Sequence, residues 1–181
     1  MKPPRRHFSA PSRLLHWTMA VLIMTMLFVG VGMVSTVSRL HLTLVALHRP
    51  LGMALLALVI VRAGVRLACG APPLPADLPG WQRLGAYASH LALYGLMVAM
   101  PLVGWSMLSA GGFPVVMAGS FHLPPIMPRN VTLYAVLRTA HTWLAFALFA
   151  TVLLHLGAAL FHAWIRRDGV MASMARGEPH A

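Results

Sequence analysis

Four long apolar stretches, separated by short segments rich in glycine, proline and charge, dominate the chain. Three of them contain no Asp, Glu, Lys or Arg: residues 14–38, 84–128 and 139–165. Each exceeds the roughly 20 apolar residues that a helix needs to cross a bilayer. A fourth stretch, about residues 43–67, carries Arg49 and Arg62 near its two ends.

These stretches are predicted to be helices, because hydrocarbon offers no water to satisfy the backbone of any open structure. We predict an all-α membrane protein, a four-transmembrane-helix bundle forming a single domain over residues 1–181, with helices at about 16–37, 43–67, 81–109 and 133–166. Between the second and third helices, residues 71–79 hold four prolines, which cannot continue a helix. The connector 111–130 is also punctuated by glycine and proline, yet it is apolar, and we expect it to fold over the bundle.

Composition agrees with a membrane protein, since 59% of the residues are hydrophobic and only 9% are charged. A soluble domain usually has about 25% charged residues. The first apolar run follows basic residues, as in a signal peptide, but it is too long and lacks a small-x-small cleavage site, so we expect a retained helix. The single Cys69 excludes an internal disulfide and a Cys-x-x-Cys-His haem attachment.

Basic residues predict the orientation, because they accumulate on the cytoplasmic side of membrane proteins. Four lie at the end opposite the termini: Arg39, Arg49, Arg129 and Arg138. Ten lie at the end that holds both termini: Lys2, Arg5, Arg6, Arg13, Arg62, Arg66, Arg83, Arg166, Arg167 and Arg176. All three acidic residues are at this second end: Asp77, Asp168 and Glu178. We therefore place both termini in the cytoplasm of a multi-pass protein of the bacterial inner membrane.

Histidines are the candidate functional residues, because a polar ring inside a bilayer is costly and is retained for a purpose. Five of the ten lie in or beside the predicted spans: His16, His48, His90, His141 and His155. Any one of them alone could simply hydrogen-bond a carbonyl of a neighbouring helix. The spacing within the set favours a more specific interpretation.

His141 and His155 are 14 residues apart, which places them on one face of the last helix, about 21 Å apart along its axis. His16 enters the membrane at the inner level and His48 at the outer level. Depth therefore pairs His16 with His155, and His48 with His141. Two stacked pairs of imidazoles from different helices are what two six-coordinate, non-covalent haem b groups require.

Glycines and arginines near these depths are further candidates. Gly30 lies 14 residues after His16 and Gly52 one turn after His48, where backbone without side chains would clear a macrocycle; close helix packing is the alternative reason. Arg49 and Arg138 suit anionic propionates at the outer level. Arg13, Arg62 and Arg66 suit the inner level. Snorkelling to headgroups, the alternative, suits Arg66 and Arg166 better than Arg62.

Two more histidines lie toward the inner side. His90, flanked by Tyr87 and Tyr94, could replace an inner ligand, bond a propionate or serve a quinone. His162 is seven residues after His155, on the same face. Either could contact a cofactor or substrate.

The chain resembles the bacterial cytochrome b561 family, small relatives of the haem subunits of Ni–Fe hydrogenase and formate dehydrogenase. The resemblance covers nearly the whole length and rests on several segments in order: S-R-L-L-H-W (12–17), L-H-R-P-L-G (47–52), A-M-P-L-V-G-W (99–105), L-P-P (123–125), H-T-W-L-A (141–145), L-H-L-G-A-A-L-F-H (154–162) and R-R-D-G-V (166–170).

The resemblance implies the same four haem ligands, His16, His48, His141 and His155, and leaves His90 without an axial role. It also implies exchange of electrons with the quinone pool, with ubiquinone as the acceptor. One branch of the family resembles a superoxide oxidase, while others serve periplasmic proteins. A haem subunit docked to a dehydrogenase or hydrogenase is the alternative, although this chain has little outside the membrane.

The outer end carries four arginines, with His41 and His122, and no acidic residue. Such a surface steers anions toward it, and we hypothesise a small anionic donor such as superoxide. The expected partners are membrane lipid, quinone, this donor or a redox protein, and a second copy of the chain, but no nucleic acid. A histidine-based transporter is a remote alternative, because such proteins usually need intramembrane carboxylates.

Overall fold

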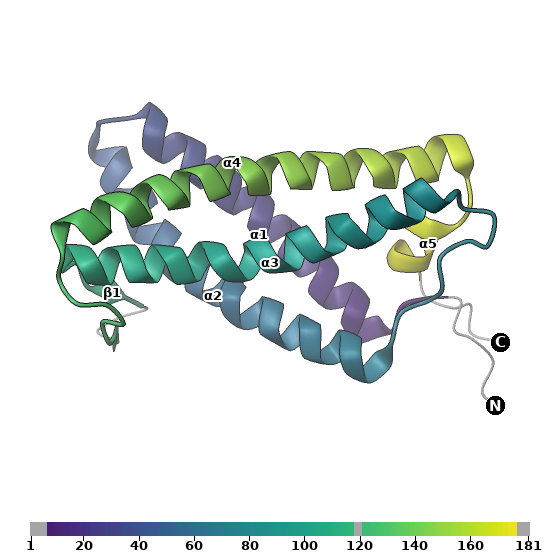
Figure 1. Cartoon of the computed structure of the whole chain (residues 1–181), viewed down its shortest axis with the longest axis horizontal. Coiled ribbons are helices and arrows are strands. Elements are labelled where there is room, and N and C mark those ends of the chain that lie inside the picture. Colours follow the sequence, from purple (N-terminus) through teal and green to yellow (C-terminus); the bar gives the residue numbers. More distant parts are fainter. Residues whose placement is uncertain (1–6, 118–120, 177–181) are drawn as a thin grey trace.

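The computed structural model describes residues 7–117 and 121–176. Four helices in it are long and apolar enough to cross a membrane. They are α1 (Ala10–Ser35), α2 (Arg39–Cys69), α3 (Gly80–Gly111) and α4 (Val131–Phe161), and α4 continues as one π-helical turn, η1 (His162–Arg166). A short helix α5 (Val170–Ala175) and a hairpin of β1 (Val115–Val116) with β2 (His122–Leu123) complete the fold (Figure 1). The predicted all-α fold with four transmembrane helices is confirmed.

The helices begin earlier than their apolar stretches because polar side chains cap them. Ser9 accepts a hydrogen bond from the backbone N–H of Ser12, and Ser38 accepts one from Leu40. Asn130 caps α4 in the same way by accepting from the N–H of Leu133. These caps place the start of α1 at residue 10 and that of α2 at residue 39, where the apolar stretches predict 16 and 43.

The bundle consists of two helical hairpins. α1 packs mainly against α2, and α3 packs mainly against α4, while α2 and α3 join the two hairpins. A small core lies where they meet, formed by Met19, Leu56 and Val59, with Tyr94 and Met97 packed against it. Many of the remaining large apolar side chains are exposed, as expected for helices that face lipid.

The connector between α3 and α4 folds back over its end of the bundle, as its apolar composition predicts. Val115 of β1 is buried, and β1 contacts both α2 and α3. Trp105 donates its indole N–H to the carbonyl of Pro124, and Ser109 accepts from the N–H of Ile126. The loop is therefore fastened to α3.

The opposite end holds the first and last residues described. Phe8 donates its backbone N–H to the carbonyl of Ser173 (3.1 Å), so the two ends of the described chain lie together. Lys2, Arg5, Arg6 and Glu178, which contribute to the predicted orientation, lie outside the described residues. The cytoplasmic location of this end stays a prediction, and we call it the inner end below; the end with the β-hairpin is the outer end.

Candidate functional site

Two pairs of imidazole rings meet inside the bundle, and they are the pairs that depth predicts. His16 of α1 and His155 of α4 have ring centroids 6.3 Å apart, with an interplanar angle of 68°. His48 of α2 and His141 of α4 have centroids 6.2 Å apart, at 70°. The two pairs are nearly identical in geometry. Since α4 supplies one ring to each, its 14-residue spacing sets their separation along the bundle.

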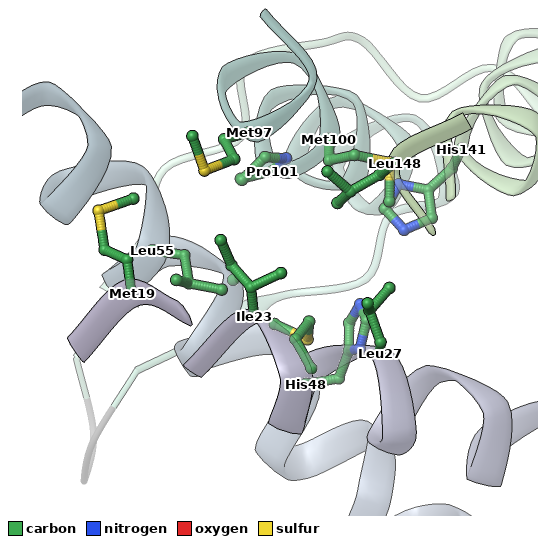
Figure 2. A pocket seen from close by; sticks show the side chains of 12 residues that line it. Met19, Ile23, Leu27, His48, Leu55, Met97, Met100, Pro101, His141 and Leu148 are labelled. Carbon is green, nitrogen blue, oxygen red and sulfur yellow. The ribbon is translucent and has the colours of Figure 1, made fainter. Parts of the chain in front are cut away.

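The outer pair borders an apolar cavity between the two hairpins. His48, His141 and Gly52 line it together with aliphatic and methionine side chains. Figure 2 shows the two rings on the same side of this cavity, with Leu27 and Leu148 beside them. The Nδ1 atoms of both histidines are buried without a hydrogen-bond partner among the described residues. Buried nitrogens of this kind usually have a partner, so the pair is suited to a ligand.

The cavity has a volume of about 60 Å³. Closed pockets for small-molecule cofactors usually measure about 300–1,000 Å³. The cavity alone is therefore smaller than such a pocket.

Glycines shape the space around the outer pair. A Cβ at Gly30 would meet nothing within 4 Å, and a Cβ at Gly52 would make ordinary contact with Met26 at 3.5 Å. Gly104 of α3, which the sequence does not single out, has less free space beside it, because a Cβ there would lie 3.2 Å from Cε1 of His141. Gly104 therefore lets α3 approach the His141 ring closely.

The inner pair has a third ring beside it. His90 of α3 lies with its centroid 5.7 Å from that of His155, closer than His16 does. Arg62 is near this cluster, because it donates to the hydroxyl of Tyr94 at 3.2 Å and to the carbonyl of Ser12 at 3.4 Å. The inner level thus combines three imidazoles with a half-buried guanidinium.

The arginines predicted for the outer level lie beside the outer pair in sequence. Arg49 directly follows His48, is half-buried, and donates to the carbonyl of Pro114 at 3.5 Å. Arg138 precedes His141 by three residues on α4 and is exposed. Arg39 and Arg129 are exposed at the same end.

His162 has a partner of its own at the inner end. Its Nδ1 lies 2.6 Å from Oδ2 of Asp168, which also accepts from Nε of Arg166 at 3.0 Å. Arg166 reaches Asp77 as well, at 2.7 Å. Burial would raise the pKa of the Asp168 carboxyl, but the hydrogen bonds from His162, the N–H of Val170 and Arg166 hold that pKa below its ordinary value. These contacts are therefore complete at neutral pH and are lost only in acid, as the carboxyl takes up a proton.

Comparison with known proteins identifies the family. A sequence profile for prokaryotic cytochrome b561 matches residues 7–177. The chain is 30% identical over 162 residues to "Cytochrome b561 homolog 2" of Escherichia coli (strain K12), covering 88% of this chain and 86% of the relative. It is 27% identical over 176 residues to "Cytochrome b561 homolog 1" of the same organism, covering 92% and 96%. A further relative is "Probable superoxide oxidase CybB" of Yersinia pestis, 29% identical over 129 residues, covering 71% and 72%.

The chain belongs to the prokaryotic cytochrome b561 family. It is a membrane electron carrier and a multi-pass protein of the bacterial inner membrane, and haem b binding follows from family membership. Membership in a family of electron carriers leaves the histidine-based transporter without support.

The residues present fit haem in this cytochrome b561. His16 with His155, and His48 with His141, would hold the iron, since each pair brings two imidazole rings from different helices to within 6.2–6.3 Å of each other. In residues 7–117 and 121–176 no group of three or more His, Cys, Asp or Glu side chains is arranged to hold a bare metal ion. Paired histidines suit an iron whose other four ligands come from a macrocycle.

Replacing Gly104 with Val should disturb the outer histidine pair. The added side chain would press on the His141 ring, and overpacking of this kind costs about 1–3 kcal/mol. We expect a changed low-spin haem spectrum and a lower thermal unfolding temperature in detergent.

Gly95→Val is the matched control, because it lies on the same helix and a Cβ there meets nothing within 4 Å. It should keep the wild-type spectrum. Equal spectra for the two variants would show that Gly104 does not constrain His141.

Proposed function

We propose that this cytochrome b561 holds two non-covalent haem b groups and transfers electrons from a donor at the outer end to quinone near the inner end. His16 and His155 are the inner iron ligands, and His48 and His141 are the outer ones. The observation that carries the proposal is the pair of nearly equal ring separations, 6.3 and 6.2 Å, built on one helix. Haem supplies reversible one-electron chemistry when bound.

The remaining candidates surround these ligands. Gly52 lines the cavity, which supports a role in clearing a macrocycle face, whereas the same role for Gly30 rests on its 14-residue spacing from His16. Arg49 and Arg138 would neutralise the outer propionates, and Arg62 an inner propionate or a quinone oxygen. Because arginine stays charged inside proteins, each can fix an anionic group in place.

The quinone site is proposed at the inner cluster, with His90 as its main residue. His90 is half-buried and lies beside His155, and Tyr94 and Arg62 are near enough to add hydrogen bonds. His162 is a weaker candidate, because Asp168 already occupies its Nδ1. Ubiquinone accepts two electrons and two protons there to become the quinol.

Superoxide is the proposed donor. Four arginines and no acidic residue lie at the outer end, and two of these arginines, Arg39 and Arg129, are exposed without an assigned partner in haem binding. Such a surface raises the local concentration of an anion. Two superoxide ions would each lose one electron to become dioxygen, and together they would reduce one quinone. This choice is supported by the name of one relative, "Probable superoxide oxidase CybB" of Yersinia pestis.

Replacing a single ligand should remove a single haem. We expect His155→Ala and His141→Ala each to lower the haem content from about two per chain to about one, because one imidazole alone leaves the iron weakly held. His90→Gln should keep both. Pyridine haemochrome analysis against protein concentration measures this content. Loss of a haem in His90→Gln would make His90 a ligand instead.

Removing outer charge should slow reduction by superoxide. With Arg39→Ser and Arg129→Ser combined, we expect the rate of haem reduction under a controlled superoxide flux to fall by roughly ten-fold at low salt. The remaining rate should depend less on ionic strength. Stopped-flow absorbance at the haem bands gives the rate.

The matched control is Arg83→Ser, which removes an exposed charge at the inner end. It should leave the superoxide rate unchanged. Rates insensitive both to salt and to the outer substitutions would exclude steering and would favour a protein donor.

His90→Gln should slow quinone reduction without altering the haem spectra. A residue that positions or protonates quinone contributes a factor of about 10²–10⁴ in general acid–base catalysis, and we expect a fall of at least roughly ten-fold. The measurement is quinol formation by the pre-reduced protein. Tyr87→Phe, an exposed neighbour on the same helix, is the control. An unchanged rate in His90→Gln would move the quinone site elsewhere.

A further inference from the structure

The two helices that carry the inner histidines do not have each other as main packing partners. α1 packs chiefly on α2 and α4 chiefly on α3. Yet the His16 and His155 rings face each other at 6.3 Å across the space between these helices. The spacing of the two rings therefore depends on contacts other than direct packing of α1 on α4, among them the small core around Met19.

The segment after η1, residues 167–176, spans this space, and we call it the strap. The backbone turns sharply at its start, with Arg167 at φ 54° and Gly169 at φ 79°. Asp168 fastens this turn to η1, which continues α4. Its Oδ2 accepts from His162 and Arg166, and its Oδ1 accepts from the backbone N–H of Val170 at 3.2 Å. The side chain of Asp168 is only 10% exposed.

The far end of the strap is fastened to the first helix. The indole N–H of Trp17 donates to the carbonyl of Met174 at 3.2 Å, and the N–H of Phe8 donates to Ser173 at 3.1 Å. Trp17 directly follows His16, and their ring centroids are 5.2 Å apart. The strap thus holds α1 at the residue next to an inner ligand.

We propose that the strap sets the spacing of His16 and His155, with Asp168 and Trp17 as its positioning residues. Asp168 anchors it to the end of α4, and Trp17 connects it to α1 beside His16. The inference rests on the proposed haem ligation of this pair. It gives the C-terminal segment a role in holding the inner haem, without contact with the haem itself.

The outer pair should be independent of the strap. His48 and His141 lie near the other end of the bundle, where Gly104 and the connector between α3 and α4 determine the packing. A change in the strap should therefore act on one haem only. A general loss of stability would act on both.

The test uses the full-length, haem-loaded protein with Trp17→Phe and, separately, Asp168→Asn. The first removes the indole N–H and keeps an aromatic ring; the second removes the charge that pairs with Arg166. We expect each to release one haem roughly ten-fold faster to excess apomyoglobin, in line with the 10–100-fold effect of outer-shell substitutions at metal sites. The midpoint potential of that haem should shift as well, and that of the other should not.

Each variant has a control of the same chemical kind. Trp81→Phe removes an exposed indole at the inner end, where Trp81 is 74% exposed. Asp77→Asn removes the other carboxylate that pairs with Arg166, and Asp77 is 75% exposed. Exposed ion pairs contribute little to stability, and an exposed indole has little packing to lose. Both controls should therefore release haem at the wild-type rate.

His155→Ala and His141→Ala proteins supply the reference spectra that identify the released haem as inner or outer. Wild-type release and potentials in both strap variants, or equal effects on the two haems, would overturn the strap proposal. If His155→Ala keeps both haems, the proposed ligands are wrong, whatever the strap variants do. If the Asp168→Asn protein cannot be produced in folded form, haem release from the Trp17→Phe protein alone tests the strap proposal.

Discussion

The arrangement of this protein depends on the cost of placing an imidazole in hydrocarbon without a partner. Helical backbone satisfies itself, but a histidine ring does not. Each of the four rings proposed as ligands lies beside a ring from another helix, and a haem iron would supply the partner that the rings themselves lack. His141 and His155 place one ring of each pair on the same helix. α1 and α2 then each need to bring only one ring to the right depth. Two helical hairpins can therefore surround two sites without a large shared core.

Much of this could be predicted from the sequence, because depth in a membrane is nearly a linear function of position along a helix. Charge-free stretches mark the spans, and the order of the spans assigns His16 and His48 to opposite levels. The rotation of each helix about its own axis is harder to predict from the sequence. When every face is apolar, hydrophobic periodicity does not show which face meets a neighbour. That is why Gly104, whose importance lies in its approach to His141, is not apparent from the sequence.

The ends of the helices were predicted less well, since local hydrogen bonds determine them. Ser9 and Ser38 extend α1 and α2 beyond their apolar stretches. The R-R-D-G-V segment contributes to the family resemblance, but its sequence does not reveal that Asp168 joins His162, Arg166 and the next helix. Trp17 and Met174, which are joined by a hydrogen bond, are 157 residues apart in the sequence. Only the fold brings the strap to α1.

Charge at the two ends is handled differently, and the difference bears on the direction of electron flow. At the inner end Arg166 is paired with Asp77 and Asp168, so that part of the basic surface is compensated within the protein. The outer end has no carboxylate to compensate its arginines. An anion arriving there gains attraction without competing with a fixed counter-ion. A quinone is neutral and dissolves in the bilayer, so it needs hydrogen-bonding groups such as His90 at membrane depth and no such field. In the proposed function, the outer arginines would attract the anionic donor and His90 would bind the quinone, so electron transfer from the outer to the inner end would use both features.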